Sequence, residues 1–394
     1  MSVTAIPDPV KFALWGKAAG LCQYRGCNHT LWRDDLTRWE FNGAYIAHIV
    51  ADKPNGPRGD AVLSPLLAAD ISNLMLMCDV HHRLIDRGAV AGHPVETLRQ
   101  MKDEHERRVE LQTGIGPDMQ TEILCYSAGI GDHPAPTDYR LCRDALRPDR
   151  YPASVRGIGL GMKESAVTDT DALFWKFQEA HLRRQFADRL QPRLEDGSIR
   201  HLSVFAVAPQ PLLMLLGYLL ADISVVVDTF QRRREPASWT WHGQPEIGRL
   251  ILDEPTTRQK KNALVFSLSA TVTDDRIHAV MGEDCAIWKV RFEHPHHDAI
   301  RHRSQLTEFR QLCRQVLDRI KADVGQNETL HVFPAMPVSA AVEFGRVIQP
   351  KADLAIQIYD QQQPRGFVPA LSLHQCGDSA PRTIDQPEPS TIQP

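Results

Sequence analysis

From about residue 140 onward, short apolar runs alternate with stretches of helical periodicity. The apolar runs resemble strands; they cover residues 201–208, 224–230 (which is rich in valine), 264–271, 286–292, 329–333 and 354–359. A buried helix is expected at 212–221 and an amphipathic helix at 305–321. Strands that alternate with helices predict an α/β domain.

The first part of the chain is richer in Cys, His and Trp, with helical patterns at 10–20 and 96–113. Glycines and prolines gather at 113–138, which we interpret as a linker or irregular crossing. The end of the chain has few apolar side chains to bury and is expected to be disordered. The pattern therefore predicts a first domain at 1–112, a linker at 113–138, a second domain at 139–380 and a disordered tail at 381–394.

The second domain repeats a local order of strand, proline and helix. The order occurs around 200–230 and again around 329–360, which predicts two similar α/β halves. Open α/β sheets bind ligands beyond the carboxyl ends of their strands. We therefore expect a ligand near VFAVAPQP and HVFPAMP, where prolines end two strands.

Charge does not by itself indicate a nucleic-acid partner. The 394 residues carry a formal net charge of −4, and residues 1–110 contain 13 Lys and Arg against 14 Asp and Glu. Any affinity for DNA must then come from local patterning, a metal ion, or charge summed over an oligomer.

No targeting signal is visible. Residues 1–8 lack the basic start and apolar core of a signal peptide. The most apolar stretch, 203–227, contains Pro209, Pro211 and Asp222, so we expect no membrane span. We expect a cytoplasmic protein, whose eight cysteines are thiols or metal ligands rather than disulfides.

Two pairs of candidate metal ligands lie in the first domain. Cys22 and Cys27 frame the turn CQYRGC, and Cys78 and His81 lie in CDVH. Structural zinc takes four sulfur and nitrogen ligands, usually as two close pairs from separate segments. The spacing predicts a structural Zn²⁺ site, and the alternative is four unrelated buried residues. A small domain with little apolar mass gains folding free energy from such a site.

Residues suited to phosphodiester hydrolysis are interleaved with these pairs. The chemistry needs a histidine that deprotonates water and a divalent ion that stabilises developing charge. We expect His48, which ends a short strand-like run, to be the base. Asn73 and His82 are expected to hold Mg²⁺ or another divalent ion together with the surrounding loop. Asp60 and Asp86 are weaker candidates and are more typical of solvated or capping acids.

The series AHI, SNLMLMC, HH and LID resembles the motif of HNH endonucleases, whose three named letters are His48, Asn73 and His82. The resemblance implies a ββα-metal domain. Many HNH domains also carry zinc on two C-x-x-C pairs; here His81 stands where the fourth cysteine usually does. The residue before the first histidine is often a metal-binding Asp, Glu or His, but here it is Ala47. The metal shell stays open, with His82 as the first ligand and Asn73 as the next.

Other motifs favour ordinary structural roles. His29, His93 and His105 are expected at the surface. The histidine-rich run at 294–303 has no paired segment and is interpreted as a polar loop before a helix. The run RGIGLGMKES at 156–165 lacks the G-x4-G-K spacing of a phosphate-binding loop.

The second domain contains candidate nucleotide-binding residues. Arginine forks bind phosphates and indole rings stack on bases. The segment VDTFQRRREPASWTW supplies both, and the strand exits and the GR that follows FPAMP add further positions. The expected ligand-binding residues are Gln210, Gln231, Arg232, Trp239, Trp241, Pro334, Arg346 and Tyr359. The alternative is that the tryptophans belong to the core and the arginines to a solvated face.

The first domain, followed by D-x-F-Q-x-x-R, W-x-W and FPAMPVSAAVEFGR, resembles the HNH–SAVED effector nucleases of bacterial CBASS antiphage signalling. The similarity covers nearly the whole chain apart from the tail. It implies a mixed α/β (α+β) fold, with a zinc-stapled ββα-metal domain before a SAVED domain of two fused CARF-like Rossmannoid halves. In that family a cyclic di- or trinucleotide binds SAVED, drives protomers to assemble into homo-oligomers, and switches on cleavage of double-stranded DNA.

Two other functions remain open at this point. One is an HNH restriction endonuclease whose C-terminal domain reads modified DNA, although residues 140–380 show no basic face. The other is a zinc-stabilised DNA- or nucleotide-binding protein with an inactive nuclease site, which only Ala47 favours.

Overall fold

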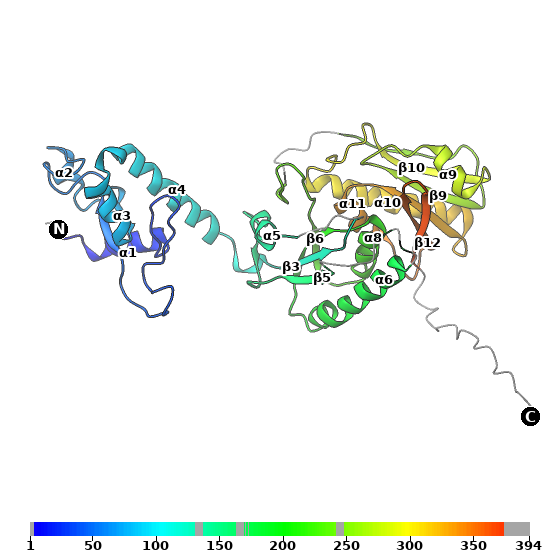
Figure 1. Ribbon diagram of the computed structural model, residues 1–394, viewed down its shortest axis with the longest axis horizontal. Helices are drawn as coiled ribbons and strands as arrows, with labels where there is room; N and C mark the ends of the chain where they lie inside the picture. The colour runs from blue at the N-terminus through cyan, green and yellow to red at the C-terminus, as the bar shows by residue number, and fades with distance from the viewer. Residues whose placement is uncertain are drawn as a thin grey trace, which may run out of the picture. The chain divides into compact units, whose positions relative to one another are not determined.

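The computed structural model describes residues 4–130, 137–162, 169, 171, 173–241 and 248–373. The tail predicted at 381–394 lies outside these residues. The chain divides into two compact units, Met1–Pro117 and Asp118–Pro394 (Figure 1). Along the described residues, no helix combines the length and the apolar character needed to cross a bilayer.

The first unit is a β-hairpin surrounded by helices. Its elements are α1 (Asp8–Ala18), β1 (Tyr45–His48), α2 (Leu63–Leu67), β2 (Leu74–Met77), α3 (Asp79–Arg83) and α4 (Val95–Thr113), with single turns at Ile71–Asn73, Leu84–Gly88 and Val90–Gly92. β1 pairs antiparallel with β2, and His48 lies opposite Leu74. α3 follows β2 directly, so the chain forms the hairpin–helix order that the sequence predicts around His82.

Apolar side chains at helical spacing fix the helices against the hairpin. Leu98 and Met101 of α4 share one buried cluster with Leu14 and Ala18 of α1. All four side chains of β2 belong to the same cluster. The strand ends, from which the candidate nuclease residues project, are therefore anchored in the core of the unit.

The segment predicted as a linker, 113–138, is partly a core strand. β3 (Gln120–Ser127) runs through it, and most of its side chains are buried. The glycines and prolines that suggested a linker flank this strand and do not interrupt it. The prediction was wrong because breakers on both sides hid a short apolar run. The second domain, expected from residue 139, thus begins before β3.

The first sheet of the second unit is parallel. β4 (Tyr151–Pro152) and β5 (Ile158–Gly161) pair with one side of β3, β6 (His201–Val207) pairs with the other side, and β7 (Val226–Thr229) pairs with β6. The helices are α5 (Tyr139–Ala145), α6 (Phe174–Gln185), α7 (Gln191–Glu195) and α8 (Gln210–Leu219).

The second sheet has a parallel centre and antiparallel edges. Its order is β13 (Gly366–Leu373), β12 (Ala355–Gln362), β11 (Thr329–Ala335), β9 (Lys261–Ser267), β10 (Cys285–Phe292) and β8 (Leu250–Asp253). The edge strands β13 and β8 run antiparallel to their neighbours. The helices are α9 (Asp274–Met281), α10 (Arg303–Val324) and α11 (Val338–Val347).

The predicted repeat of strand, proline and helix is confirmed in both halves. α8 follows β6 after Pro209, and α11 follows β11 after Pro337. The two helices pack against each other between the sheets (Figure 1), inside an apolar cluster that runs through both halves. They approach closely because glycine faces glycine. A Cβ added at Gly345 would lie 2.1 Å from the carbonyl oxygen of Met214 and 2.9 Å from Cα of Gly217.

Candidate metal centre and nuclease site

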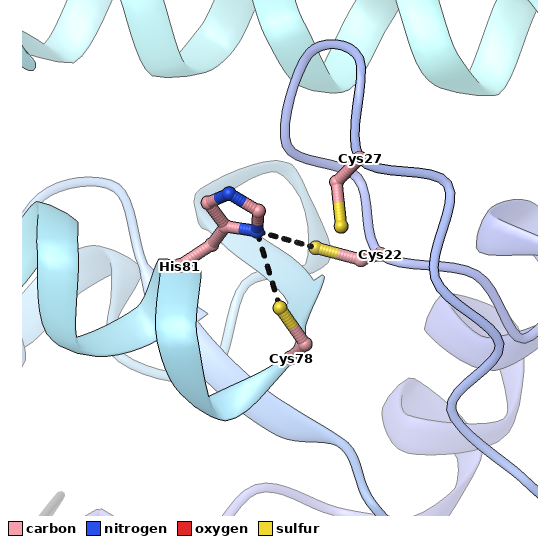
Figure 2. A group of neighbouring side chains, drawn as sticks. All are labelled: Cys22, Cys27, Cys78 and His81. Carbon is pink, nitrogen blue, oxygen red and sulfur yellow. Dashed lines mark hydrogen bonds between the residues drawn. The ribbon is translucent and has the colours of Figure 1, made fainter. Parts of the chain in front are cut away.

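The predicted metal ligands converge in the first unit (Figure 2). The ligand atoms of Cys22, Cys27, Cys78 and His81 all lie within 4.8 Å of one another. Nδ1 of His81 lies 3.1 Å from Sγ of Cys78 and 3.7 Å from Sγ of Cys22. A tetrahedral zinc ion with Zn–S bonds of ~2.3 Å separates its ligand atoms by roughly 3.5–3.8 Å. The four side chains therefore have a spacing that fits zinc.

Short-range backbone structure positions these ligands. The amide of Cys27 donates to the carbonyl of Tyr24 at 3.0 Å, which closes the turn between the two cysteines. Cys78 is the N-cap of α3, so His81 lies on the first turn of the helix, and its ring points back toward Cys78. The ring of Tyr24 stacks on His81 at a centroid distance of 4.1 Å and fixes the plane of the imidazole.

In the absence of a nearby positive charge, the thiols of Cys22 and Cys27 resist ionisation. Burial raises the pKa of the Cys22 thiol to about 12, against the lowering effect of the backbone amides of Cys78 and Tyr24. Burial also raises the pKa of Cys27. Buried thiols that are costly to ionise alone give up their protons to a metal, because the ion supplies the missing counter-charge.

The Cys78→Ser variant is expected to lose about one zinc ion per chain and to unfold the first unit, because zinc binding is coupled to folding. Metal analysis of purified protein and hydrogen exchange along α4 measure both effects. Cys285→Ser is the matched control, since Cys285 is a buried thiol of the second unit that lies apart from this centre. Purified wild-type protein without tightly bound zinc would contradict the prediction. Chelation is a poorer test, because it also removes a catalytic ion.

His48 lies at the end of β1 and is held by a backbone carbonyl. Its Nε2 lies 2.9 Å from the carbonyl oxygen of Ala68. A carbonyl only accepts, so Nε2 carries the proton and the lone pair of the neutral ring lies on Nδ1. Within the described residues no hydrogen bond involves that Nδ1. The ring is thus oriented with one basic nitrogen available.

Asn73 holds the loop that follows His48. Its Oδ1 accepts from the amide of Val50 at 2.7 Å, and its Nδ2 donates to the carbonyl of Val50 at 2.8 Å. The side chain is 2% exposed. Of the two roles predicted for Asn73, the structure assigns it the loop. Its part as a metal ligand stays a prediction, although its Oδ1 is buried and already accepts one hydrogen bond.

His82 lies on α3 between an aromatic ring and a carboxylate. The ring of Tyr45 stacks on it at 5.0 Å, and its Nε2 lies 3.5 Å from Oδ2 of Asp86. Desolvation lowers the pKa of His82, although Asp86 acts in the opposite direction. A neutral imidazole beside a carboxylate is the usual state of a metal-binding histidine.

Arg58 connects these residues and was missed from the sequence. Its guanidinium donates to Asp86 at 2.8 Å, to the carbonyl of Ile49 at 2.8 Å and to that of Ile85 at 2.6 Å. The side chain is buried, so these bonds fix Asp86 next to His82. Arg58 lies in the run PNGPRGD, whose residue types alone do not indicate a supporting role for the arginine.

The weaker candidates in the first unit have structural roles. Asp60 holds the turn that precedes α2, since its Oδ1 accepts from the amides of Val62 and Leu63. His29 is half-exposed, as expected. His93 and His105, predicted at the surface, are instead buried because they bond the carbonyls of Ala89 and Ala18. Ala47 is 1% exposed in the core. Among the described residues, the Cys/His quartet is the one place where three or more potential metal ligands converge.

Several predicted nucleotide-binding residues instead join the two halves of the second unit. Gln210 accepts from the amide of Met336 at 3.0 Å. Gln231 accepts from the Ser339 hydroxyl at 2.6 Å. Arg346 donates to Glu343 at 2.8 Å and to the carbonyl of Val227 at 3.2 Å. Each of these side chains bonds the other half of the second unit, across a boundary that we call the seam.

Three further predicted residues are corrected because they lie inside the fold. Trp239 is 1% exposed and packs edge-on against Phe205 at 5.3 Å, so it offers no face to a base. Tyr359 stacks on Phe333 at 4.4 Å, and Pro334 is buried in β11. For Trp239, the alternative that the tryptophan belongs to the core is confirmed.

Arg232 and Trp241 are each half-buried. The guanidinium of Arg232 lies 5.6 Å from the centre of the Trp239 ring, and Trp241 tilts against Phe230 at 6.1 Å. Gln210 and Arg346 are also half-buried, but their polar atoms already have the partners described above.

Comparison with known families identifies a sensor domain. Residues 182–373 match the family model "SAVED: SMODS-associated and fused to various effectors sensor domain". The chain therefore contains a SAVED domain, as the sequence resemblance implied for this part. The match lies entirely in the second unit.

Among solved structures, this chain is similar to SAVED/CARF-domain containing receptors. One is the Acinetobacter baumannii Cap4 SAVED/CARF-domain containing receptor with the cyclic trinucleotide 2'3'3'-cAAA: TM-score 0.41, 15% identity, covering 71% of this chain and 56% of that one. The same receptor without a named ligand gives a TM-score of 0.42 at 12% identity, covering 74% and 65%. The Moraxella osloensis Cap4 receptor gives 0.36 at 10% identity, covering 74% and 65%. This chain thus spans 56% to 65% of those receptors' lengths. The search of curated proteins found no match.

Proposed function

We propose that this protein is a metal-dependent endonuclease that cuts double-stranded DNA under the control of a cyclic oligonucleotide. The observation that carries the proposal is the combination in one chain. A hairpin–helix unit with oriented His48 and His82 is joined to a SAVED sensor domain at 182–373. The family description states that such sensors are fused to effectors, and the first unit holds the reactive groups that an effector needs.

His48 is the general base in this proposal. With Nε2–H held by Ala68, its Nδ1 takes a proton from the attacking water. His82 would hold Mg²⁺ or another divalent ion, and Arg58 and Asp86 keep its ring in place. When bound, such an ion stabilises charge on the phosphate and the leaving oxygen. The substrate phosphate and water complete the ion's ligands, since magnesium uses few protein groups.

The SAVED domain supplies control. The Acinetobacter baumannii receptor also has a structure with 3'3'3'-cAAA, and we extend a cyclic di- or trinucleotide ligand to this chain. The ligand would shift a population from inactive to active assemblies by binding the latter more tightly. Assembly brings two nuclease sites to the two DNA strands and sums weak contacts.

The isolated protein is expected to be nearly inert on plasmid DNA with Mg²⁺, and one cyclic oligonucleotide should raise cleavage by about tenfold or more. A nicking assay with a nucleotide panel that includes 2'3'3'-cAAA and 3'3'3'-cAAA measures the change. Sedimentation in the same mixtures reports assembly. The sensor proposal fails if no nucleotide alters cleavage, melting temperature or oligomeric state. Cleavage confined to base-modified DNA, without nucleotide, would indicate the restriction enzyme instead.

A further inference from the structure

A cavity of about 360 Å³ lies at the carboxyl ends of β3 and β5, apart from the seam described above. Its floor consists of Cys125 and Ser127 of β3 and, directly opposite in register, Gly159 and Gly161 of β5. The alternate residues Leu124, Tyr126 and Ile158 belong to the apolar core and do not line the cavity. Tyr139 of α5 forms a wall.

The three glycines in β5 and directly before it have different roles. A Cβ at Gly161, where φ is +90°, would lie 2.0 Å from the carbonyl oxygen of Ser127. A Cβ at Gly157 would lie 2.6 Å from that of Ile123. Close strand packing therefore requires both. A Cβ at Gly159 would meet nothing within 4 Å, so packing does not explain this glycine. Its missing side chain leaves the cavity open.

The rim of the cavity is cationic. Arg156 and Arg189 line it, and among the described residues no Asp or Glu does. Within the described residues neither guanidinium forms an ion pair, although Arg189 donates to the carbonyl of Gly159 at 2.9 Å. The buried Ser127 adds a hydroxyl to the floor. These groups complement an anion.

We propose that this cavity binds a phosphorylated ligand of about mononucleotide size. Ligand sites in open α/β sheets lie beyond the carboxyl ends of strands, where this cavity is. Guanidinium forks suit phosphate oxygens, and the ring of Tyr139 offers an apolar surface to a base. The same chemistry comes from two sources, a free nucleoside monophosphate or one nucleotide of a cyclic oligonucleotide. The assignment to a cyclic oligonucleotide rests on the proposed function.

Calorimetric titration of the full chain with AMP, and separately with 3'3'3'-cAAA, tests the site. Gly159→Trp should fill the cavity without displacing backbone and abolish binding. Arg156→Gln should weaken binding by about tenfold, as expected for a lost charged hydrogen bond. Arg184→Gln is the control, because Arg184 is an exposed arginine of α6 that does not line the cavity. It should bind like the wild type.

Loss of AMP binding in Gly159→Trp, with an unchanged melting temperature, supports the site. Loss of 3'3'3'-cAAA binding in the same variant would indicate that the phosphorylated ligand of this cavity is part of a cyclic oligonucleotide. Should Gly159→Trp unfold, Arg156→Gln decides, since its side chain is exposed at the rim. The inference is overturned if the wild type binds neither compound, or if both variants bind normally. Nucleotide-stimulated DNA cleavage that persists in Gly159→Trp would leave the nuclease proposal standing and remove only this site.

Discussion

The His48→Ala variant is expected to lose nucleotide-stimulated DNA cleavage by a factor of about 10²–10⁴, the usual contribution of a general base. The expectation rests on the orientation of the ring. Ala68 holds Nε2–H at 2.9 Å, which leaves Nδ1 as the basic atom. Zinc content and nucleotide binding should stay at wild-type levels, because His48 belongs neither to the Cys/His quartet nor to the second unit.

Two companion variants separate chemistry from folding. His29→Ala removes a half-exposed histidine of the same unit and should cut DNA normally. His48→Gln keeps an N–H donor for the Ala68 carbonyl but has no basic nitrogen, so it should be as inactive as His48→Ala. Plasmid cleavage rates under saturating nucleotide give the comparison. A near wild-type rate in either His48 variant would remove this residue from the mechanism.

The convergence of the Cys/His quartet could be predicted from the sequence because its geometry is local. Each pair of ligands lies within one turn, so the spacing between Cys22 and Cys27 or between Cys78 and His81 already constrains the distances. The hairpin–helix order around His48 and His82 was also predictable, since strand, strand and helix follow one another with short connections.

The groups that hold the rings of His48 and His82 in place were not predictable in the same way. Arg58 reaches Asp86 across 28 positions, and His48 reaches the Ala68 carbonyl across 20. Such contacts depend on how loops fold back on the hairpin. Nothing in the residue types of the loop distinguishes a supporting arginine from a solvated one.

The nucleotide-binding residues were difficult to predict for a related reason. Trp239 and Tyr359 are amphipathic side chains that suit a binding site or a core equally well. Their burial is decided by Phe205 and Phe333, aromatic partners on other strands. Likewise, Gln231 and Arg346 bond residues more than 100 positions away, across the seam between the halves. Sequence order shows that two halves exist, but it does not show which polar side chains join them.

The Gly345→Ala variant is expected to destabilise the second unit, because Gly345 lies where α11 crosses α8. Alanine normally stabilises a helix relative to glycine by about 1 kcal/mol. Here the new Cβ would lie 2.1 Å from the Met214 carbonyl oxygen, 2.8 Å from the Tyr218 nitrogen and 2.9 Å from Cα of Gly217. All three are backbone atoms of α8, so α8 and α11 must separate. Overpacking costs about 1–3 kcal/mol and occasionally more, which lowers the melting temperature by roughly 5–10 °C in a unit of this size.

Gly217→Ala should have a similar effect, since its Cβ would lie 2.0 Å from the Val342 carbonyl oxygen. Gly16→Ala is the matched control, because Gly16 lies within α1 and a Cβ there meets nothing within 4 Å. It should stabilise the chain slightly. Hydrogen exchange localises the response: amides of α8 and α11 should exchange faster in both seam variants, and those of α1 should not. A Gly345→Ala variant with the wild-type melting temperature and unchanged hydrogen exchange would contradict this prediction. The contact between the two halves would then depend on the hydrogen bonds of Gln210 and Gln231 and not on the close approach of the glycines.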